Sequence, residues 1–229
     1  MRAPIEHVVV VVPARDEERL IDRCLRSVAV ACGAVDGPSV QVVVVLDDCR
    51  DGTRAMSSRF DVELCAIDAG SVGVARAHGV SRGLAESTAS AGRTWIASTD
   101  ADSQVPPQWL TCQLALAQRG ADVVVGTVRP DPSDLTAAEH RAWSATRVPG
   151  RPNGHVHGAN LGIRADAYLR AGGFLPQDEH EDVDLVARIA RDPLAVVVAS
   201  DECDVLTSGR RVGRTPGGYA RYLRTALSG

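Results

Sequence analysis

The amino-acid sequence predicts an α/β fold in which helices cover both faces of a mostly parallel sheet. Short β-branched runs alternate with segments of helical periodicity over the first half of the chain, as in successive βαβ units. The first run, residues 7–12, is apolar on both faces, as buried parallel strands are. Charged residues and glycines gather directly after these runs, where open parallel sheets bind ligands. The 229 residues fit a single domain of this kind.

Five strands and three helices are expected in the first half. The strands are expected at residues 7–12, 40–46, 62–67, 94–98 and 121–128. A helix over residues 17–32 has apolar residues at helical spacing and Gly33 as its C-cap. A second helix begins near Val74 after a glycine turn, and a third lies between Pro107 and Gly120. Such alternation predicts right-handed crossovers.

The second half is less regular. Residues 129–158 contain four prolines and one helical segment near 134–147, so they form a long excursion of the kind that serves as a lid or binding loop. Beyond it we expect a strand at 160–163, a helix at 165–170, a helix from Asp182, strands at 194–199 and 203–207, and a basic tail. This half is therefore expected to form a smaller, mixed region of the same domain.

Composition excludes several functions. The net charge is −4 and the basic residues are scattered, so no nucleic-acid partner is expected. All 25 basic residues are arginine, which excludes a P-loop lysine, a Schiff-base lysine and a Ser-Lys dyad. Phosphate binding is left to guanidinium groups. We find no apolar run long enough to cross a membrane and no signal peptide, and expect a cytoplasmic protein.

The cysteines show no CxxC pair and no regular spacing. They are Cys24, Cys32, Cys49, Cys65, Cys112 and Cys203. In a chain of this length we expect reduced, mostly buried thiols, and neither a disulfide framework nor a zinc site.

An Asp-Ala-Asp motif follows the fourth expected strand. Asp100 and Asp102, one residue apart at a strand end, can offer hard oxygen ligands to Mg²⁺ or Mn²⁺. A cation held there and shared with a diphosphate would neutralise charge on a leaving phosphate. The alternative is a solvated turn, and the preceding apolar run makes the two interpretations about equal.

Two further segments after strands have the residue types of a nucleotide site. Asp47 and Asp48 end the second strand and can accept hydrogen bonds from a base or a ribose, or form a turn before a helix. Residues 70–76 form a glycine turn that opens a helix and ends in Arg76, which suits an anion, although an ordinary turn fits equally.

An acidic segment begins the last expected helix. Glu181 and Asp182 complement the helix dipole, or one of them acts as a general base for an attacking hydroxyl. The nearby His155, His157 and His180 do not match a zinc signature, so core or surface histidines are favoured over metal ligands.

The order of these motifs resembles that of family 2 glycosyltransferases. Seven segments between about residues 8 and 218 carry the resemblance. They are residues 8–18, residues 44–53, residues 70–79, the Asp100-Ala101-Asp102 motif, residues 158–164 with 172–174, residues 181–185 with Arg188, and residues 208–211 with Gly217 and Gly218.

The resemblance implies a GT-A fold and an inverting glycosyltransferase that uses a nucleotide-diphosphate sugar, with a UDP- or GDP-sugar expected. Residues 1–128 would bind this donor, and residues 129–229 would hold an unknown hydroxyl acceptor and the catalytic base. Implied donor-site residues are Pro13, Ala14, Glu17, Asp47, Asp48, Arg76, Asp100, Ala101, Asp102 and Arg210. The resemblance is also compatible with a homodimer.

It further implies individual roles. Asp102, helped by Asp100, would hold Mg²⁺ or Mn²⁺ on the diphosphate, and Asp182, with Glu181 beside it, would be the base. Arg210 and Arg211 would add positive charge to the diphosphate, or would form a solvated tail.

Two rival functions remain open. A sugar-phosphate nucleotidylyltransferase also combines an α/β nucleotide domain with metal-binding carboxylates, but the acidic segment 13–18 lacks the glycine-rich basic loop such enzymes carry. A catalytically silent domain that binds nucleotide sugars is the second rival, and the intact Asp100, Asp102 and Asp182 argue against it.

Overall fold

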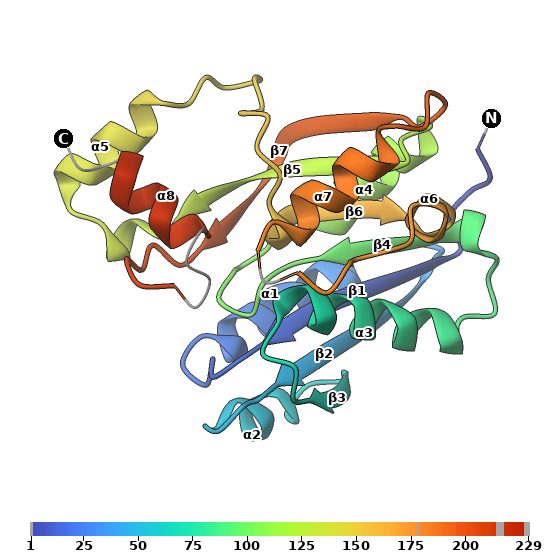
Figure 1. The fold of residues 1–229 in the computed structure, drawn as a ribbon, viewed down its shortest axis with the longest axis horizontal. Helices are drawn as coiled ribbons and strands as arrows, with labels where there is room; N and C mark the ends of the chain where they lie inside the picture. Colours follow the sequence, from blue (N-terminus) through green and yellow to red (C-terminus); the bar gives the residue numbers. More distant parts are fainter. Residues whose placement is uncertain (1, 178, 214–217, 227–229) are drawn as a thin grey trace.

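Seven strands form one sheet in the computed structural model, which describes residues 2–177, 179–213 and 218–226 (Figure 1). The strands are β1 (His7–Ala14), β2 (Ser39–Asp47), β3 (Glu63–Ile67), β4 (Thr94–Ser98), β5 (Val123–Pro130), β6 (Leu161–Arg164) and β7 (Val197–Thr207). Their order is β3-β2-β1-β4-β6-β5-β7, and only β6 runs antiparallel to its neighbours. The predicted mostly parallel α/β sheet is therefore confirmed.

The register of the central strands brings their carboxyl ends to one edge. Ala14 at the end of β1 lies opposite Leu46 of β2, and Val11 lies opposite Ser98, the last residue of β4. The chain segments that follow β1, β2 and β4 consequently leave the sheet side by side. This edge is where ligands bind in parallel sheets.

Helices cover both faces because successive side chains of a strand point to opposite sides. On one face, α1 (Ile21–Gly33) and α4 (Trp109–Gln118) pack against the even-numbered valines of β1. On the other, α3 (Val72–Glu86), α6 (Ala165–Arg170) and α7 (Glu181–Ile189) share a core with the odd-numbered valines. Figure 1 shows α3 lying along the sheet close to β1. The predicted helices on both faces are thus confirmed.

The second half departs from expectation in two places. The strands expected at 194–199 and 203–207 are one strand, β7, whose pairing with β5 shifts register between Gly126 and Val128. The basic tail carries a helix, α8 (Tyr219–Ala226), that periodicity did not reveal. The helix expected at 134–147 is α5 (Ala137–Ala145), which begins at a capping box formed by Thr136 and Glu139.

Short elements complete the fold. They are α2 (Thr53–Ser57) and the 3₁₀ turns η1 (Ala91–Arg93), η2 (Pro132–Asp134) and η3 (Gly158–Asn160). None of the helices in the described part of the chain has the length and apolar character needed to span a bilayer.

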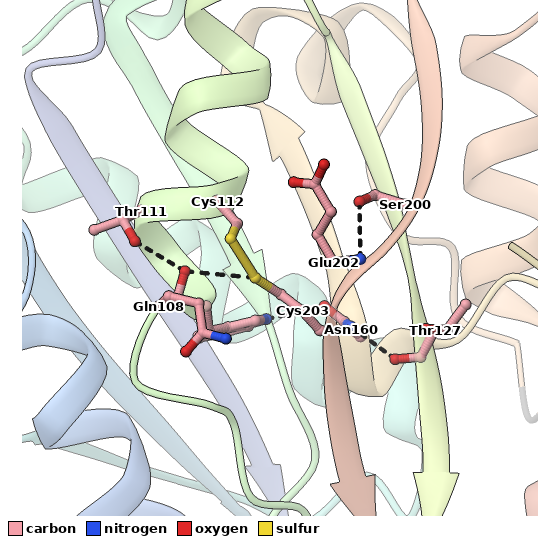
Figure 2. The surroundings of a disulfide bond; sticks show 9 residues. Gln108, Thr111, Cys112, Thr127, Asn160, Ser200, Glu202 and Cys203 are labelled. Carbon is pink, nitrogen blue, oxygen red and sulfur yellow. Dashed lines mark hydrogen bonds between the residues drawn. A yellow bond between two sulfur atoms is a disulfide. The ribbon is translucent and has the colours of Figure 1, made fainter. Parts of the chain in front are cut away.

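The cysteine prediction is wrong for one pair. Cys112 of α4 and Cys203 of β7 form a disulfide, with their Cα atoms 6.8 Å apart (Figure 2). The fold brings together two residues that are 91 positions apart, so spacing in the sequence could not reveal the pair. Cys24 and Cys65 are buried free thiols, and burial raises the pKa of both.

Candidate active site

A cavity of about 1310 Å³ opens at the carboxyl edge of the sheet. Its lining includes all of the predicted site residues except Asp48 and Arg211, and Arg211 pairs with Glu139. The predicted residues in the lining are Pro13, Ala14, Glu17, Asp47, Arg76, Asp100, Ala101, Asp102, Glu181, Asp182 and Arg210. These residues end or follow β1, end β2, follow β4 or β7, lie on α3, or begin α7. The cavity is larger than a typical pocket for one drug-sized ligand, so it can hold a ligand made of two linked groups.

The second strand ends in two aspartates with different surroundings. The buried Asp47 carboxylate accepts hydrogen bonds from the backbone N–H groups of Ala69, Gly70 and Ser71, at 2.8–2.9 Å. Asp47 therefore fixes the turn that precedes α3. Asp48, by contrast, pairs with Arg15 at 3.0 Å and with Arg50 at 3.1 Å.

Carboxylates cluster around the Asp-Ala-Asp motif. The Arg210 guanidinium bridges Oε1 of Glu17 and Oδ2 of Asp102, each at 2.8 Å. Burial chiefly, together with the Asp100 and Glu17 carboxylates, raises the pKa of Asp102 to about 6, although Arg210 opposes this shift. Negative charge is therefore crowded at this end of β4.

Arg76 links this cluster to the beginning of α7. Its side chain is 4% exposed, and the guanidinium contacts Oδ1 of Asp100 at 2.5 Å and pairs with the buried Glu181 carboxylate. Gly158 leaves the space that the guanidinium fills, since a Cβ there would lie 2.3 Å from Cζ of Arg76. Arg76 thus holds β4 and α7 in a fixed relation.

Asp182 is the half-exposed acid of this region. Its Oδ2 accepts a hydrogen bond from the Gly158 backbone N–H at 2.6 Å, and its Oδ1 accepts one from Val183 at 2.8 Å. Glu181 and Asp182 both line the cavity but differ in surroundings: Glu181 is buried and paired with Arg76, whereas Asp182 is half-exposed.

Aromatic side chains line the far part of the cavity. The rings of His155, His157, Tyr219 and Tyr222 contact one another with centroids 5.7–6.2 Å apart. This four-ring cluster joins the segment before η3 to α8. Sequence reasoning missed this cluster because α8 itself was not expected. A signal was present, since two of the chain's three tyrosines lie in that tail.

Arg147 of the same region is held by its own partners. It pairs with Asp204 at 2.5 Å and lies over the Trp143 ring at 5.0 Å. Arg147 lines the cavity, and among the described residues its polar contacts go to Asp204 and Thr127 and not to Asp100 or Asp102.

The motif carboxylates suit a divalent cation. Asp100 and Asp102 supply hard oxygen donors at the cavity wall, and the crowded negative charge that raises the pKa of Asp102 would be relieved by a cation. Within the described residues no group of three or more His, Cys, Asp or Glu side chains could hold a metal. The remaining ligands would therefore be water and donor oxygens, as is usual for Mg²⁺.

Other residues of the motif segments have buried structural partners. Asn160 donates to the carbonyl of Thr127 (Figure 2) and to that of Cys203, both at 2.8 Å, and accepts from the Trp109 indole. Arg164, 1% exposed, donates to three backbone carbonyls of other segments. Gly217 of the C-terminal motif lies outside the described residues.

Comparison with known proteins identifies a matching family and several solved structures with a similar fold. A protein-family model described as glycosyl transferase family 2 matches residues 9–168. A search of the curated proteins finds no match to the sequence.

Three solved structures are similar to the whole chain. S. aureus TarS 1–349 in complex with UDP-GlcNAc has a TM-score of 0.67 at 12% identity over 93% of this chain and 61% of that one. Mannosyltransferase PcManGT from Pyrobaculum calidifontis with GDP-Man and Mn²⁺ has a TM-score of 0.62 at 22% identity, covering 98% and 63%. Glucosyl-3-phosphoglycerate synthase from Mycobacterium tuberculosis, with Mn²⁺, UDP and phosphoglyceric acid, has a TM-score of 0.61 at 17% identity, covering 97% and 77%.

These likenesses show the fold, and the expected GT-A arrangement is confirmed. The chain spans 61% of the length of the TarS fragment.

Proposed function

The chain belongs to glycosyl transferase family 2, and from that membership we propose that it transfers a sugar from a nucleotide-diphosphate sugar to an acceptor hydroxyl. One observation carries the proposal. A single cavity brings the paired carboxylates Asp100 and Asp102 together with the half-exposed Asp182. Metal-binding acids and a separate, accessible base are the groups that such a transfer needs.

The donor occupies the part of the cavity built by residues 1–128. Pro13, Ala14 and Glu17 line the nucleoside pocket, while Asp47 acts by fixing the turn at residues 69–71. The similar structures carry UDP-GlcNAc, GDP-Man or UDP, which supports a UDP- or GDP-sugar as donor. Residues 129–229 contribute the acceptor side, including Asp182 and the four-ring cluster.

Asp100 and Asp102 would hold the divalent cation, Mg²⁺ or Mn²⁺. When bound, the cation would neutralise the negative charge that develops on the departing diphosphate. Two of the similar structures contain Mn²⁺, which supports this assignment. Arg210 adds a guanidinium that can bind phosphate oxygens in a fork.

Asp182 acts as the general base. It takes the proton of the acceptor hydroxyl, whose oxygen forms a bond to the anomeric carbon as the bond to the diphosphate oxygen breaks. Attack from the face opposite the diphosphate inverts the configuration and needs no covalent intermediate. Glu181 acts as a positioning residue, because its carboxylate is buried and paired with Arg76, which also contacts Asp100.

Two substitutions test these roles. Asp182→Asn should abolish most nucleotide release from the donor while leaving Mn²⁺-dependent donor binding intact, because the lost interaction matters in the transition state. Asp102→Ala should instead weaken Mn²⁺-dependent binding of UDP or GDP. Asp184→Asn is the matched control, since Asp184 lies in the same helical turn but pairs with Arg188 at 2.7 Å.

Binding is measured by thermal stability with Mn²⁺ and again with EDTA. A ligand at 100 times its Kd adds about 2.7 kcal/mol of stability, so a true donor is easily detected. Equal loss of donor binding in Asp182→Asn and Asp102→Ala would contradict the assigned roles. Normal donor binding with no turnover in wild type and Asp182→Asn alike would favour a silent binding domain.

A further inference from the structure

Arg210 closes over the Asp-Ala-Asp motif from the far side of the cavity. Arg210 lies 108 residues after Asp102 in the sequence, yet its guanidinium contacts both Asp102 and Glu17 at 2.8 Å. Both acids are buried, whereas the Arg210 side chain is 34% exposed. The half-exposed guanidinium of Arg210 thus neutralises two buried acids.

Arg210 is the strongest partner of Asp102. Among the described residues, the other oxygen of this carboxylate, Oδ1, accepts long hydrogen bonds, at 3.3 Å from Ser103 and 3.4 Å from Thr207. A charged guanidinium at 2.8 Å binds more strongly than a neutral hydroxyl at those distances. A metal ion that takes an oxygen of Asp102 must therefore compete chiefly with Arg210.

The arginine at Asp100 is held differently. Arg76 is 4% exposed and is also paired with Glu181, so it cannot leave Asp100 without breaking a second buried ion pair. Arg210 also has a second buried partner, Glu17, but its own side chain is 34% exposed against 4% for Arg76. Of the two motif carboxylates, Asp102 therefore has the less enclosed arginine.

We propose that Arg210 takes the place of the divalent cation at Asp102 in the nucleotide-free protein, and moves to the donor's diphosphate when the cation binds. This inference rests on the proposed function. A guanidinium and a divalent cation on one carboxylate repel each other, whereas the diphosphate offers the freed guanidinium two anionic oxygens in the geometry that it prefers. Release of Arg210 therefore couples metal binding to donor binding.

Only the side chain has to move in this exchange. Gly209 donates its backbone N–H to Oδ2 of Asp134 at 2.7 Å, and the carbonyl of Thr207 accepts the N–H of Asp131 at 2.7 Å. The backbone around Arg210 is therefore anchored to the segment after β5. Rotation of the side chain is enough to carry the guanidinium from one anion to another.

The test measures two affinities: the affinity for Mn²⁺ in the absence of nucleotide, and the affinity for nucleotide in the presence of Mn²⁺. Mn²⁺ affinity is measured by electron paramagnetic resonance on wild type, Arg210→Met and Arg147→Met. Loss of the competing guanidinium should tighten Mn²⁺ binding by about twofold to fivefold, the size expected of a half-exposed ion pair. The affinities for UDP and GDP at saturating Mn²⁺ should fall in the same variant.

The exchange predicts that Arg210→Met changes the two affinities in opposite directions, with tighter Mn²⁺ binding and weaker nucleotide binding. A merely structural Arg210 would weaken both affinities on removal, or change neither. Arg147→Met is the matched control because Arg147 lines the same cavity and is paired with Asp204, away from the motif. Its Mn²⁺ affinity should equal that of wild type.

Mn²⁺ affinity in Arg210→Met that is equal to or lower than in wild type overturns the proposal. Mn²⁺ binding that appears in this variant but not in wild type supports it. If Arg210→Met does not fold, Arg210→Lys, which keeps the charge but loses the fork, should show a smaller gain in the same direction. The proposed function fails separately, if wild type binds neither UDP nor GDP with Mn²⁺.

Discussion

Replacing Gly158 with alanine should disturb the link between β4 and α7. A Cβ at this position would lie 2.3 Å from Cζ and Nη2 of Arg76 and 2.6 Å from Nη1. Ordinary contacts between such atoms begin near 3.4 Å, so the guanidinium must shift by about 1 Å. Asp100 and Glu181 oppose that shift, because both bind the same guanidinium.

The magnitude follows from these contacts. Forcing an extra methyl into a packed interior costs about 1–3 kcal/mol. Weakening a charged hydrogen bond of Arg76 adds to this cost, giving a loss of about 2–4 kcal/mol in the free energy of unfolding. For a chain of this size each kcal/mol lowers Tm by about 2–4 °C, so Tm should fall by at least about 4 °C.

Thermal and denaturant unfolding measure the effect, with Gly33→Ala as control. Gly33 ends α1, and a Cβ there meets nothing within 4 Å, so this variant should match or slightly exceed the stability of wild type. Nucleotide release should also fall in Gly158→Ala, since the Gly158 N–H holds Asp182. Equal stability and equal release in the two variants would refute the reasoning.

Two further predictions concern a disulfide and a histidine. Denatured protein should present four free thiols without reductant and six with it, and six thiols without reductant would contradict the bond. Reduction should lower the free energy of unfolding by at most about 4.6 kcal/mol, because Cys112 and Cys203 are 91 residues apart. Burial lowers the pKa of His157 below its usual 6.5 while Asp182 opposes the shift, so unfolding takes up a proton and stability falls as the pH drops below about 6.5. His157→Gln should flatten that pH dependence in urea unfolding, and an unchanged slope would count against it.

The first half of the fold was predictable because its signals are local. Residues 7–12 are apolar on both faces, and the helix after them has period 3.6, so each element is visible within a few residues. The site edge follows from the same elements, because parallel strands align their carboxyl ends. The position of Asp100 and Asp102 beside residues 13–17 therefore needed no knowledge of distant contacts.

The rest depends on contacts between distant residues. Arg76 and Glu181 are 105 positions apart, and nothing in either segment indicates that one neutralises the other. The same holds for Asn160, which the motif places on the acceptor side, although its amide joins Thr127 to Cys203 inside the protein. A motif gives a residue's neighbourhood, whereas the partner of its side chain is decided by packing.

The absence of lysine has a consequence for the charge balance of the site. A buried lysine can lose its proton when a cation approaches, but a guanidinium keeps its charge at any pH that the protein tolerates. Arg76 and Arg210 therefore cannot yield to a metal by titration. Each arginine is paired with two acids, but Arg76 is buried and Arg210 is half-exposed, so we expect the excess positive charge to be relieved by movement of the Arg210 side chain. An all-arginine site thus makes donor binding depend on a displaced side chain where a lysine would have allowed a lost proton.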